Sequence, residues 1–165
     1  MALGIYTVKE AYVNSLMPIA PHLFHNSKEG QTHSRKYIGV VLTVGGFNYF
    51  APLSSFKPKH ARMKNSLDFI KIGDYAVINL NCMFPVPEGM FCKVDIRKER
   101  DSRYRDLLLA ELRVIRRNES RIKHNAEVLY RYKLTHGNDT KLAERCNDFL
   151  AIEAACLRYR KDKGN

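Results

Sequence analysis

Residues 37–51 read Tyr37-Ile-Gly-Val-Val-Leu-Thr-Val44, Gly45-Gly46 and Phe47-Asn-Tyr-Phe-Ala51, and this stretch decides the fold. Both outer runs are rich in β-branched and aromatic residues, which favour strands. Two glycines between such runs favour a hairpin, because glycine readily takes the positive φ that tight hairpin turns require. The stretch therefore predicts two antiparallel strands joined at Gly45-Gly46.

Further strand candidates lie on both sides of this hairpin, and strands and helices do not alternate regularly along this part of the chain. Several short strands without alternating helices are typical of an antiparallel sheet. We therefore expect a small antiparallel barrel or a compact, highly curved sheet. The additional strand candidates are residues 3–8, 67–72, 75–84 and 90–96.

Helical spacing of apolar residues dominates after residue 100. Asp101 can cap a first helix, and Asn118 can separate it from a second helix over residues 119–134. Gly137-Asn138-Asp139 predicts a break before a last helix that ends in a basic tail. Near the N-terminus, residues 9–17 form a shorter helix candidate, which Pro18 would end.

The length of 165 residues fits a single α+β domain that can bury a core. We expect a β-rich core at about 1–98 and a helical part at about 101–161. A long loop is predicted over residues 18–36. The chain has no run of 18 apolar residues and no signal-peptide pattern, so a cytoplasmic protein without a membrane span is expected.

The formal net charge of +11 favours a polyanionic partner, above all a nucleic acid. Twelve of the basic residues lie between Arg97 and Lys133, against six acids in the same span. They could simply form a solvated helical face held by ion pairs, but the excess of arginine favours phosphate contacts. The helical residues expected to bind RNA are Arg113, Arg116, Arg117, Arg121 and Lys123.

The cysteines do not form a metal-binding motif. Cys82, Cys92, Cys146 and Cys156 show no CxxC pairing and lie in apolar segments, which indicates buried, reduced thiols. A zinc site with His22 and His25 is a weak alternative, because the spacing is poor. We therefore expect neither a metal nor a cofactor.

The candidate site follows the hairpin directly, in the stretch Ala51-Pro-Leu-Ser-Ser-Phe-Lys-Pro-Lys-His60. It combines two hydroxyls, two lysines and a histidine, and no carboxylate occurs between Glu29 and Asp68 to neutralise them. Hydroxyl and ammonium donors at a strand end can bind a phosphate without a metal. RNA is therefore a plausible substrate.

RNA cleavage without a metal needs a base, an acid and positive charge near the phosphorus, and it leaves a 2′,3′-cyclic phosphate. Ser54 and Ser55 can donate to phosphate oxygens, while Lys57 can stabilise the developing charge or transfer a proton. His33 and His60 are acid–base candidates. The residues that could hold flanking phosphates are Arg35, Lys36, Lys59, Arg62 and Lys64.

Each of these features also has an ordinary structural explanation. Two serines after a strand often form a turn, lysines beside Pro58 often only solvate the surface, and a lone histidine such as His60 is more often incidental than catalytic. A non-catalytic RNA-binding small-barrel module is therefore an alternative function. A DNA-binding regulator is a weaker one, because the C-terminal helices lack a helix-turn-helix signature.

Short motifs along nearly the whole chain resemble the endoribonuclease toxins of type III toxin–antitoxin systems, the ToxN/AbiQ family. Each motif is short, but their order and spacing together are hard to obtain by chance. The matching segments are Ile5-Tyr6-Thr7-Val8, Tyr37-Ile-Gly-Val-Val41, Tyr49-Phe-Ala-Pro-Leu-Ser-Ser-Phe-Lys57, Val77-Ile-Asn-Leu80 with Met83 and Pro85, and residues 108–118.

The resemblance implies a fold similar to the Kid/MazF toxins, an SH3-like curved antiparallel sheet decorated by helices. It also implies metal-independent cleavage of cellular or phage mRNA, commonly at adenine-rich sequences. The implied partner is a pseudoknot-like repeat antitoxin RNA, which the toxin processes and with which it assembles into rings. The implied biological role is defence against phage by abortive infection.

The resemblance also implies catalytic roles for Ser54, Ser55 and Lys57, with Arg35 as the basic residue before the second strand. Lys36 could substitute for Arg35. Relatives often carry a tyrosine where this chain has Gln31, so either the loop is aligned differently or His33 takes part of that role. The residue that transfers the proton is therefore left open.

Overall fold

The structure, a computed structural model, describes residues 2–23 and 33–164. Its centre is the predicted hairpin, formed by β2 (Lys36–Val44) and β3 (Phe47–Ser55). Val44 pairs with Phe47 across the turn, where Gly45 and Gly46 have positive φ values of 56° and 80°. The predicted hairpin is thereby confirmed.

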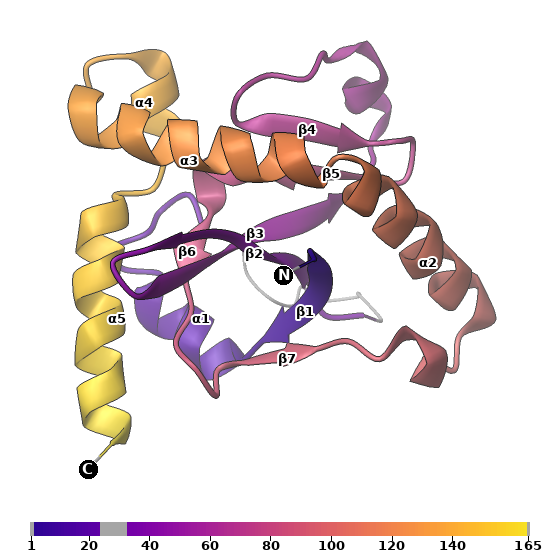
Figure 1. The fold of residues 1–165 in the computed structure, drawn as a ribbon, viewed down its shortest axis with the longest axis horizontal. Coiled ribbons are helices and arrows are strands. Elements are labelled where there is room, and N and C mark those ends of the chain that lie inside the picture. The colour runs from indigo at the N-terminus through magenta and orange to yellow at the C-terminus, as the bar shows by residue number, and fades with distance from the viewer. Residues whose placement is uncertain (1, 24–32, 165) are drawn as a thin grey trace.

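The other strands extend this hairpin on both sides, and every pairing is antiparallel. The order is β4-β5-β3-β2-β1-β7, with β6 paired to β3 beside this path. Of the two predicted forms, the curved open sheet is therefore the one observed in the described residues (Figure 1). The bounds are β1 (Gly4–Val8), β4 (Phe69–Ile72), β5 (Ala76–Asn79), β6 (Phe84–Pro85) and β7 (Phe91–Lys93).

The end of β3 lies four residues beyond the predicted strand end at Ala51. β3 continues through Pro52 because its last three residues pair with β5, in the register Leu53 to Ile78, Ser54 to Val77 and Ser55 to Ala76. Pro52 lies opposite Tyr37 of β2. The extension places the serine pair at the edge where the strand ends.

The prediction of one strand over residues 75–84 is wrong. A 3₁₀ turn, η2 (Leu80–Cys82), separates β5 from β6. The Leu80 N–H donates to the Asp68 carbonyl, and the Met83 N–H donates to the Leu80 carbonyl. Leu80 and Met83 are buried in and beside this turn. The run of apolar residues therefore indicates that the segment is buried, but not that it is a continuous strand.

Two other predicted strands are shorter than expected. The strand predicted over residues 67–72 begins only at Phe69, as β4. The one predicted over residues 90–96 is limited to β7, and η3 (Ile96–Lys98) follows it. The Asp95 side chain accepts from the Arg97 N–H at the start of η3, which favours a helical turn over continued strand.

The helices begin and end close to the predicted positions, with one exception. Asp101 caps α2 by accepting from the N–H groups of Arg103 and Tyr104, and Asn118 separates α2 from α3. The predicted last helix is two helices, because Thr140 and Asp148 each cap a separate one. The bounds are α1 (Glu10–Leu16), α2 (Ser102–Arg117), α3 (Glu119–His136), α4 (Lys141–Arg145), α5 (Phe149–Lys163) and the 3₁₀ helix η1 (Pro58–Arg62).

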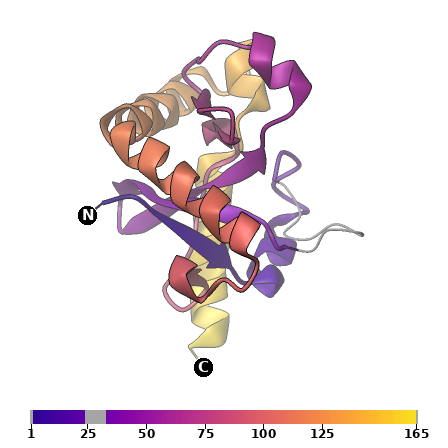
Figure 2. The same ribbon diagram turned by 90° about the vertical axis from the view of Figure 1, so that its right-hand side faces the viewer.

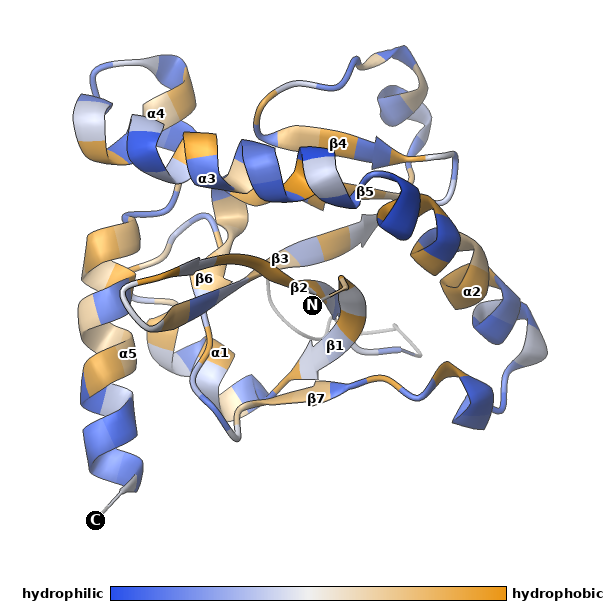
Figure 3. Cartoon of the chain, viewed as in Figure 1, coloured by the Kyte–Doolittle hydropathy of each residue, from blue (hydrophilic) through white to orange (hydrophobic). Residues whose placement is uncertain are grey.

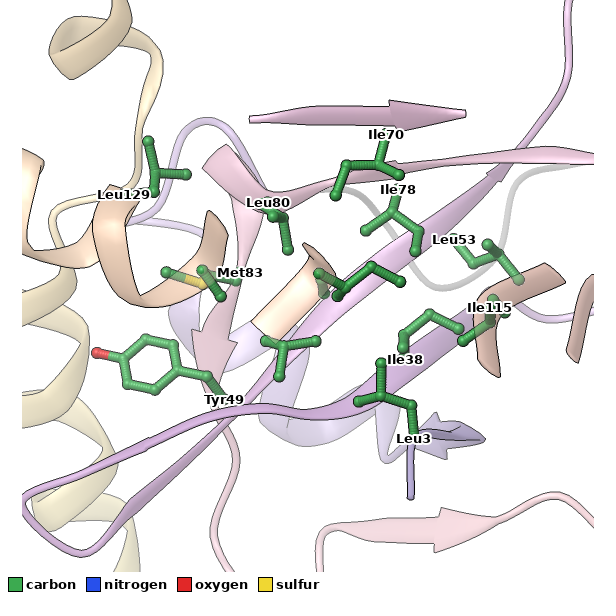
Figure 4. Close-up of a cluster of buried hydrophobic side chains, with 14 of the residues drawn as sticks. Leu3, Ile38, Tyr49, Leu53, Ile70, Ile78, Leu80, Met83, Ile115 and Leu129 are labelled. Carbon is green, nitrogen blue, oxygen red and sulfur yellow. The ribbon is translucent and has the colours of Figure 1, made fainter. Parts of the chain in front are cut away.

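Alternating side chains of the hairpin contribute to two buried clusters. Ile38, Ala51 and Leu53 belong to one cluster, which includes Ile115 of α2 and is shown in part in Figure 4. Phe50 belongs to the other cluster, with side chains of α1 and α5. Successive side chains of a strand point to opposite faces, so each face of the sheet is covered by helices.

Helix α2 crosses the sheet near the end of β3 (Figure 2). Orange apolar and blue polar segments alternate along α2 and α3 in Figure 3, as expected for helices with one buried face. Leu108 and Ile115 anchor α2 in the core, with exposed fractions of 1% and 0%. This anchoring places the neighbouring face of α2 beside the end of β3.

Candidate active site

A cavity of about 540 Å³ lies between the end of β3, the start of β2, the chain after β3 and helix α2. Its volume is in the range of ligand-binding clefts. Eight of the residues predicted from the sequence line it together. They are His33, Arg35, Lys36, Ser54, Ser55, Lys57, Lys59 and His60.

Hydrogen bonds to Ser54 organise the floor of this cavity. The Ser54 Oγ accepts from Arg35 Nη1 at 3.1 Å and from Asn79 Nδ2 at 3.4 Å. The β2–β3 register pairs Lys36 with Leu53, and the β3–β5 register places Asn79 near the same serine. Because two donors occupy its lone pairs, the hydroxyl proton is directed toward a further acceptor, such as a phosphate oxygen.

The turn after β3 presents Lys57 and Lys59 to the cavity. Pro58 begins η1, and the His60 N–H donates to the Lys57 carbonyl at 2.9 Å. In return, the Lys57 N–H donates to His60 Nδ1 at 2.9 Å. These two hydrogen bonds hold Lys57 at the base of the turn, with its exposed side chain at the cavity.

His60 is a buried residue, with an exposed fraction of 6%, between the rings of Phe56 and Phe69. Burial lowers its pKa, and the charges of Lys59, Lys57 and Lys71 lower that pKa further. The imidazole is therefore neutral at pH 7. Since its Nδ1 accepts from the Lys57 N–H, the arrangement supports a role in positioning Lys57.

The α2 wall of the cavity contains Tyr104, Leu107 and Glu111. His33 stacks on Tyr104, with ring centroids 3.7 Å apart and an angle of 8° between the planes. His33 Nε2 also lies 3.6 Å from an Asp101 carboxylate oxygen. His33 is thus held at the mouth of the site by groups of α2 and its cap.

Asn79, Tyr104 and Glu111 are cavity residues that the sequence analysis did not identify as site residues. In the sequence, Tyr104 lies at helical spacing with Leu108, which indicates only the buried face of a helix. One signal pointed to Glu111, which is a carboxylate four residues before Ile115 and therefore on the buried face of the predicted helix. Nothing in the sequence brings Asn79 next to Ser54.

The acidic and basic groups on the α2 side of the cavity affect one another through burial and charge. Burial raises the pKa of Glu111 to about 7, with Lys36 acting in the opposite direction. Burial lowers the pKa of Lys36, which Glu99 and Glu111 partly counteract. Burial also lowers the pKa of Arg35, although a guanidinium stays protonated in proteins.

The other predicted RNA-binding residues do not line the cavity. Arg62 and Lys64 are exposed residues of the η1 region. Arg113 is exposed and lies about 200° around the helix from Glu111. Lys123 Nζ lies 3.5 Å from Glu119 Oε1, and such an ion pair agrees with the alternative interpretation of this helical face as solvated and held by ion pairs. The remaining exposed residues of this set are Arg116, Arg117 and Arg121.

Among residues 2–23 and 33–164, no group of three or more His, Cys, Asp or Glu side chains could hold a metal ion. His22 Nε2 instead lies 3.0 Å from the Glu144 carbonyl, while His25 and Gln31 fall outside the described residues. Three cysteines are buried as predicted, but Cys92 is exposed, because it lies on β7 at the end of the sheet order. No helix within the described ranges has the length and apolarity of a membrane span.

Comparison with known proteins gives a consistent result. The family model described as "Toxin ToxN, type III toxin-antitoxin system" matches residues 4–156. Endoribonuclease ToxN of Bacillus thuringiensis subsp. kurstaki is 28% identical over 167 aligned positions, which cover 94% of this chain and 84% of the relative. Endoribonuclease AbiQ of Lactococcus lactis subsp. lactis is 26% identical over 175 positions, covering 98% and 91%.

Solved structures show the same fold. A type III toxin described with selective inhibition by a non-coding RNA pseudoknot superposes with a TM-score of 0.83 at 26% identity, covering 97% of this chain and 99% of the other. The structure of AbiQ, described as a lactococcal anti-phage endoribonuclease, gives a TM-score of 0.82 at 24% identity, covering 98% and 99%. The similarity therefore extends over the sheet and the helices alike.

Proposed function

The chain belongs to the ToxN family of type III toxin–antitoxin toxins, and from this premise we propose that it is an endoribonuclease toxin whose active site is the cavity around Ser54. Relatives that align over most of the chain are named endoribonucleases. The single observation that carries the proposal is the Ser54 Oγ, which accepts from Arg35 and Asn79 beside Lys57.

In the proposed reaction, the ribose 2′-hydroxyl loses its proton and attacks the adjacent phosphorus, and the 5′-oxygen leaves with a proton. The products are a 2′,3′-cyclic phosphate and a 5′-hydroxyl end, and no metal takes part. Ser54 and Ser55 donate to the nonbridging oxygens, and Arg35 and Lys57 stabilise the negative charge that develops there. His60 holds Lys57 in place through the 2.9 Å hydrogen bond to its backbone N–H.

The proton transfers have two candidates. Lys57 lines the cavity beside two other cations, Arg35 and Lys59. His33 lies at the cavity mouth, stacked on Tyr104. Either group can exchange a proton with the reacting oxygens if the RNA lies between β3 and α2.

We also propose that a folded repeat RNA holds the toxin inactive, as a non-coding RNA pseudoknot does for the structurally similar toxin. In this proposal the toxin processes the antitoxin RNA from a tandem-repeat precursor in the cytoplasm, and toxin and RNA form closed rings. Release of the toxin would then cleave cellular or phage mRNA and stop phage growth. The exposed arginines of α2 and α3 are proposed RNA contacts outside the active site, on a fold of the SH3-like Kid/MazF type.

The test uses purified protein and a mixed RNA substrate in excess chelator. Wild type should release fragments with 2′,3′-cyclic phosphate ends, and Ser54→Ala and Lys57→Ala should each slow cleavage a hundredfold or more, by analogy with loss of one transition-state donor. Matched exposed controls are Ser120→Ala and Lys161→Ala, which should cleave like wild type.

Intact RNA with a mobility shift in gels would instead favour the non-catalytic binding module. Cleavage at the wild-type rate by both Ser54→Ala and Lys57→Ala would refute the assignment of the site. Restored cleavage on adding a divalent cation to a chelated, inactive sample would refute the metal-free mechanism.

A further inference from the structure

The two walls of the cavity differ in their chemistry. The wall built from β2, β3 and η1 presents the hydroxyl and cationic donors Ser54, Ser55, Arg35 and Lys57. The α2 wall instead presents an aromatic ring, a leucine and Glu111. Phosphate suits the first wall, and an apolar surface with a carboxyl group suits a different part of the substrate.

Glu111 is a carboxyl group with no hydrogen-bond partner among the described residues. Its exposed fraction is 5%, and it lies at the cavity, seven residues after Tyr104 on one helix face. The neighbouring Lys36 Nζ donates to the Ser34 carbonyl at 3.0 Å rather than to Glu111. Because Glu111 lines the cavity, a ligand bound there that brings N–H groups can donate to its carboxyl oxygens.

A nucleobase has the properties that this wall requires. Single-stranded RNA is recognised by stacking of splayed bases on apolar or aromatic side chains and by hydrogen bonds to their edges. A phosphate suits this wall less well than a base, because the ionised form of Glu111 repels it. The exocyclic amino groups of adenine, cytosine and guanine are donors that a carboxylate accepts, whereas uracil presents two carbonyls beside its single N–H.

We infer that the α2 wall receives a base next to the scissile phosphate and that Glu111 binds the edge of this base, selecting bases with an amino group over uracil. This inference rests on the proposed endoribonuclease function and names a specificity residue for it. In this inference Glu111 contacts only the substrate base, and the groups of the opposite wall contact the reacting phosphate.

Glu111 lines the cavity together with Lys36 and with Tyr104 of the same helix. The charge of Lys36 lowers the pKa of Glu111, against the effect of burial. Lys36 also lies 5.4 Å from the Tyr104 ring centre, on the same side of the cavity. Glu111 lies on α2 with Tyr104, whereas the serine pair lies at the end of β3, and this placement favours base recognition over proton transfer at the phosphate.

The experiment measures kcat/KM on short RNA oligonucleotides that carry A, C, G or U on either side of the mapped cleavage position. Wild type, Glu111→Gln and the exposed control Glu88→Gln are compared. Glutamine has the same shape, but its amide also donates and can therefore pair with uracil. The wild-type preference for amino-bearing bases over uracil should fall about tenfold to a hundredfold in Glu111→Gln and stay unchanged in Glu88→Gln.

The inference is overturned if Glu111→Gln slows all oligonucleotides by one common factor, or if it changes none of them. Should wild type cleave no RNA, the proposed function fails, but the base preference is still measurable as binding. For that purpose, oligonucleotides lacking the 2′-hydroxyl are used. A loss of base preference in Glu111→Gln binding supports the inference, and an unchanged preference overturns it.

Discussion

Replacing Glu111 with glutamine should change how the stability of the protein depends on pH. Burial raises the pKa of Glu111 from 4.5 to about 7 in the folded protein. Between these values the folded state holds a proton that the unfolded chain has released, so stability falls as the pH rises. One pKa unit corresponds to about 1.36 kcal/mol, so this carboxyl removes about 3 kcal/mol of stability between pH 4.5 and a pH above 7.

Glutamine resembles the neutral carboxyl and does not titrate, so Glu111→Gln should escape this loss. Urea unfolding at pH 5 and pH 8, at equal ionic strength, measures the effect as the difference in unfolding free energy between variant and wild type. This difference should grow by about 2–3 kcal/mol in favour of the variant from pH 5 to pH 8. Other titrating groups are the same in both proteins and cancel.

The control for this prediction is Glu88→Gln, which changes an exposed glutamate and should follow wild type at both pH values. A difference between Glu111→Gln and wild type that stays constant from pH 5 to pH 8 would refute the reasoning, because it would show that Glu111 ionises equally easily in both states. Removing the charge of Lys36, as in Lys36→Met, should raise the pKa of Glu111 further and steepen the pH dependence.

Three further predictions concern the fold and its charge. Gly39→Ala would place a methyl group directly against the buried Phe50 ring, so urea unfolding should show a loss of about 1–3 kcal/mol, and an unchanged midpoint would contradict this packing. Burial alone would raise the pKa of Asp68, but its hydrogen bonds from Arg145, at 2.6 and 3.0 Å, and from Ser66 lower it overall. The stability that Asp68 contributes is therefore present above its unfolded pKa and is lost as the pH falls through the lower pKa of the folded state. Asp68→Asn should reduce the unfolding free energy by about 1–3 kcal/mol at pH 7 and by less than this at pH 2. An equal loss at both pH values would contradict the ion pair. Affinity for a non-cleavable RNA should fall with salt at a logarithmic slope of about −0.7 per neutralised phosphate, so a salt-independent affinity would argue against cationic binding.

The hairpin and the helix ends could be predicted from the sequence because their signals are local. Gly45 and Gly46 have the positive φ values that their turn needs, and Asp101 caps α2 with its own side chain. Each of these signals acts within a few residues, so no distant contact has to be known.

The strand over residues 75–84 and the last helix were predicted wrongly, because apolar spacing reports burial rather than geometry. The Leu80 N–H finds its acceptor in the Asp68 carbonyl, and that partner is set by how the chain packs. In the last helix, Cys146 and Asn147 are buried at the break, and the Asn147 N–H donates to the Asn81 carbonyl. The helix can break there because the free Asn147 N–H is hydrogen-bonded to a carbonyl that is distant in the sequence.

The sequence by itself determined the part of the site that is contiguous, from Ser54 to His60, because a strand end and a proline turn keep neighbouring residues together. Only the tertiary structure decided which groups complete it. The Asn79 side chain reaches Ser54 through strand pairing, and Glu111 reaches the cavity because Leu108 and Ile115 bury α2 against the sheet. Burial of apolar side chains does not by itself specify which element they pack against. The position of the Glu111 carboxyl in the cavity therefore follows only from the packing of α2 against the sheet.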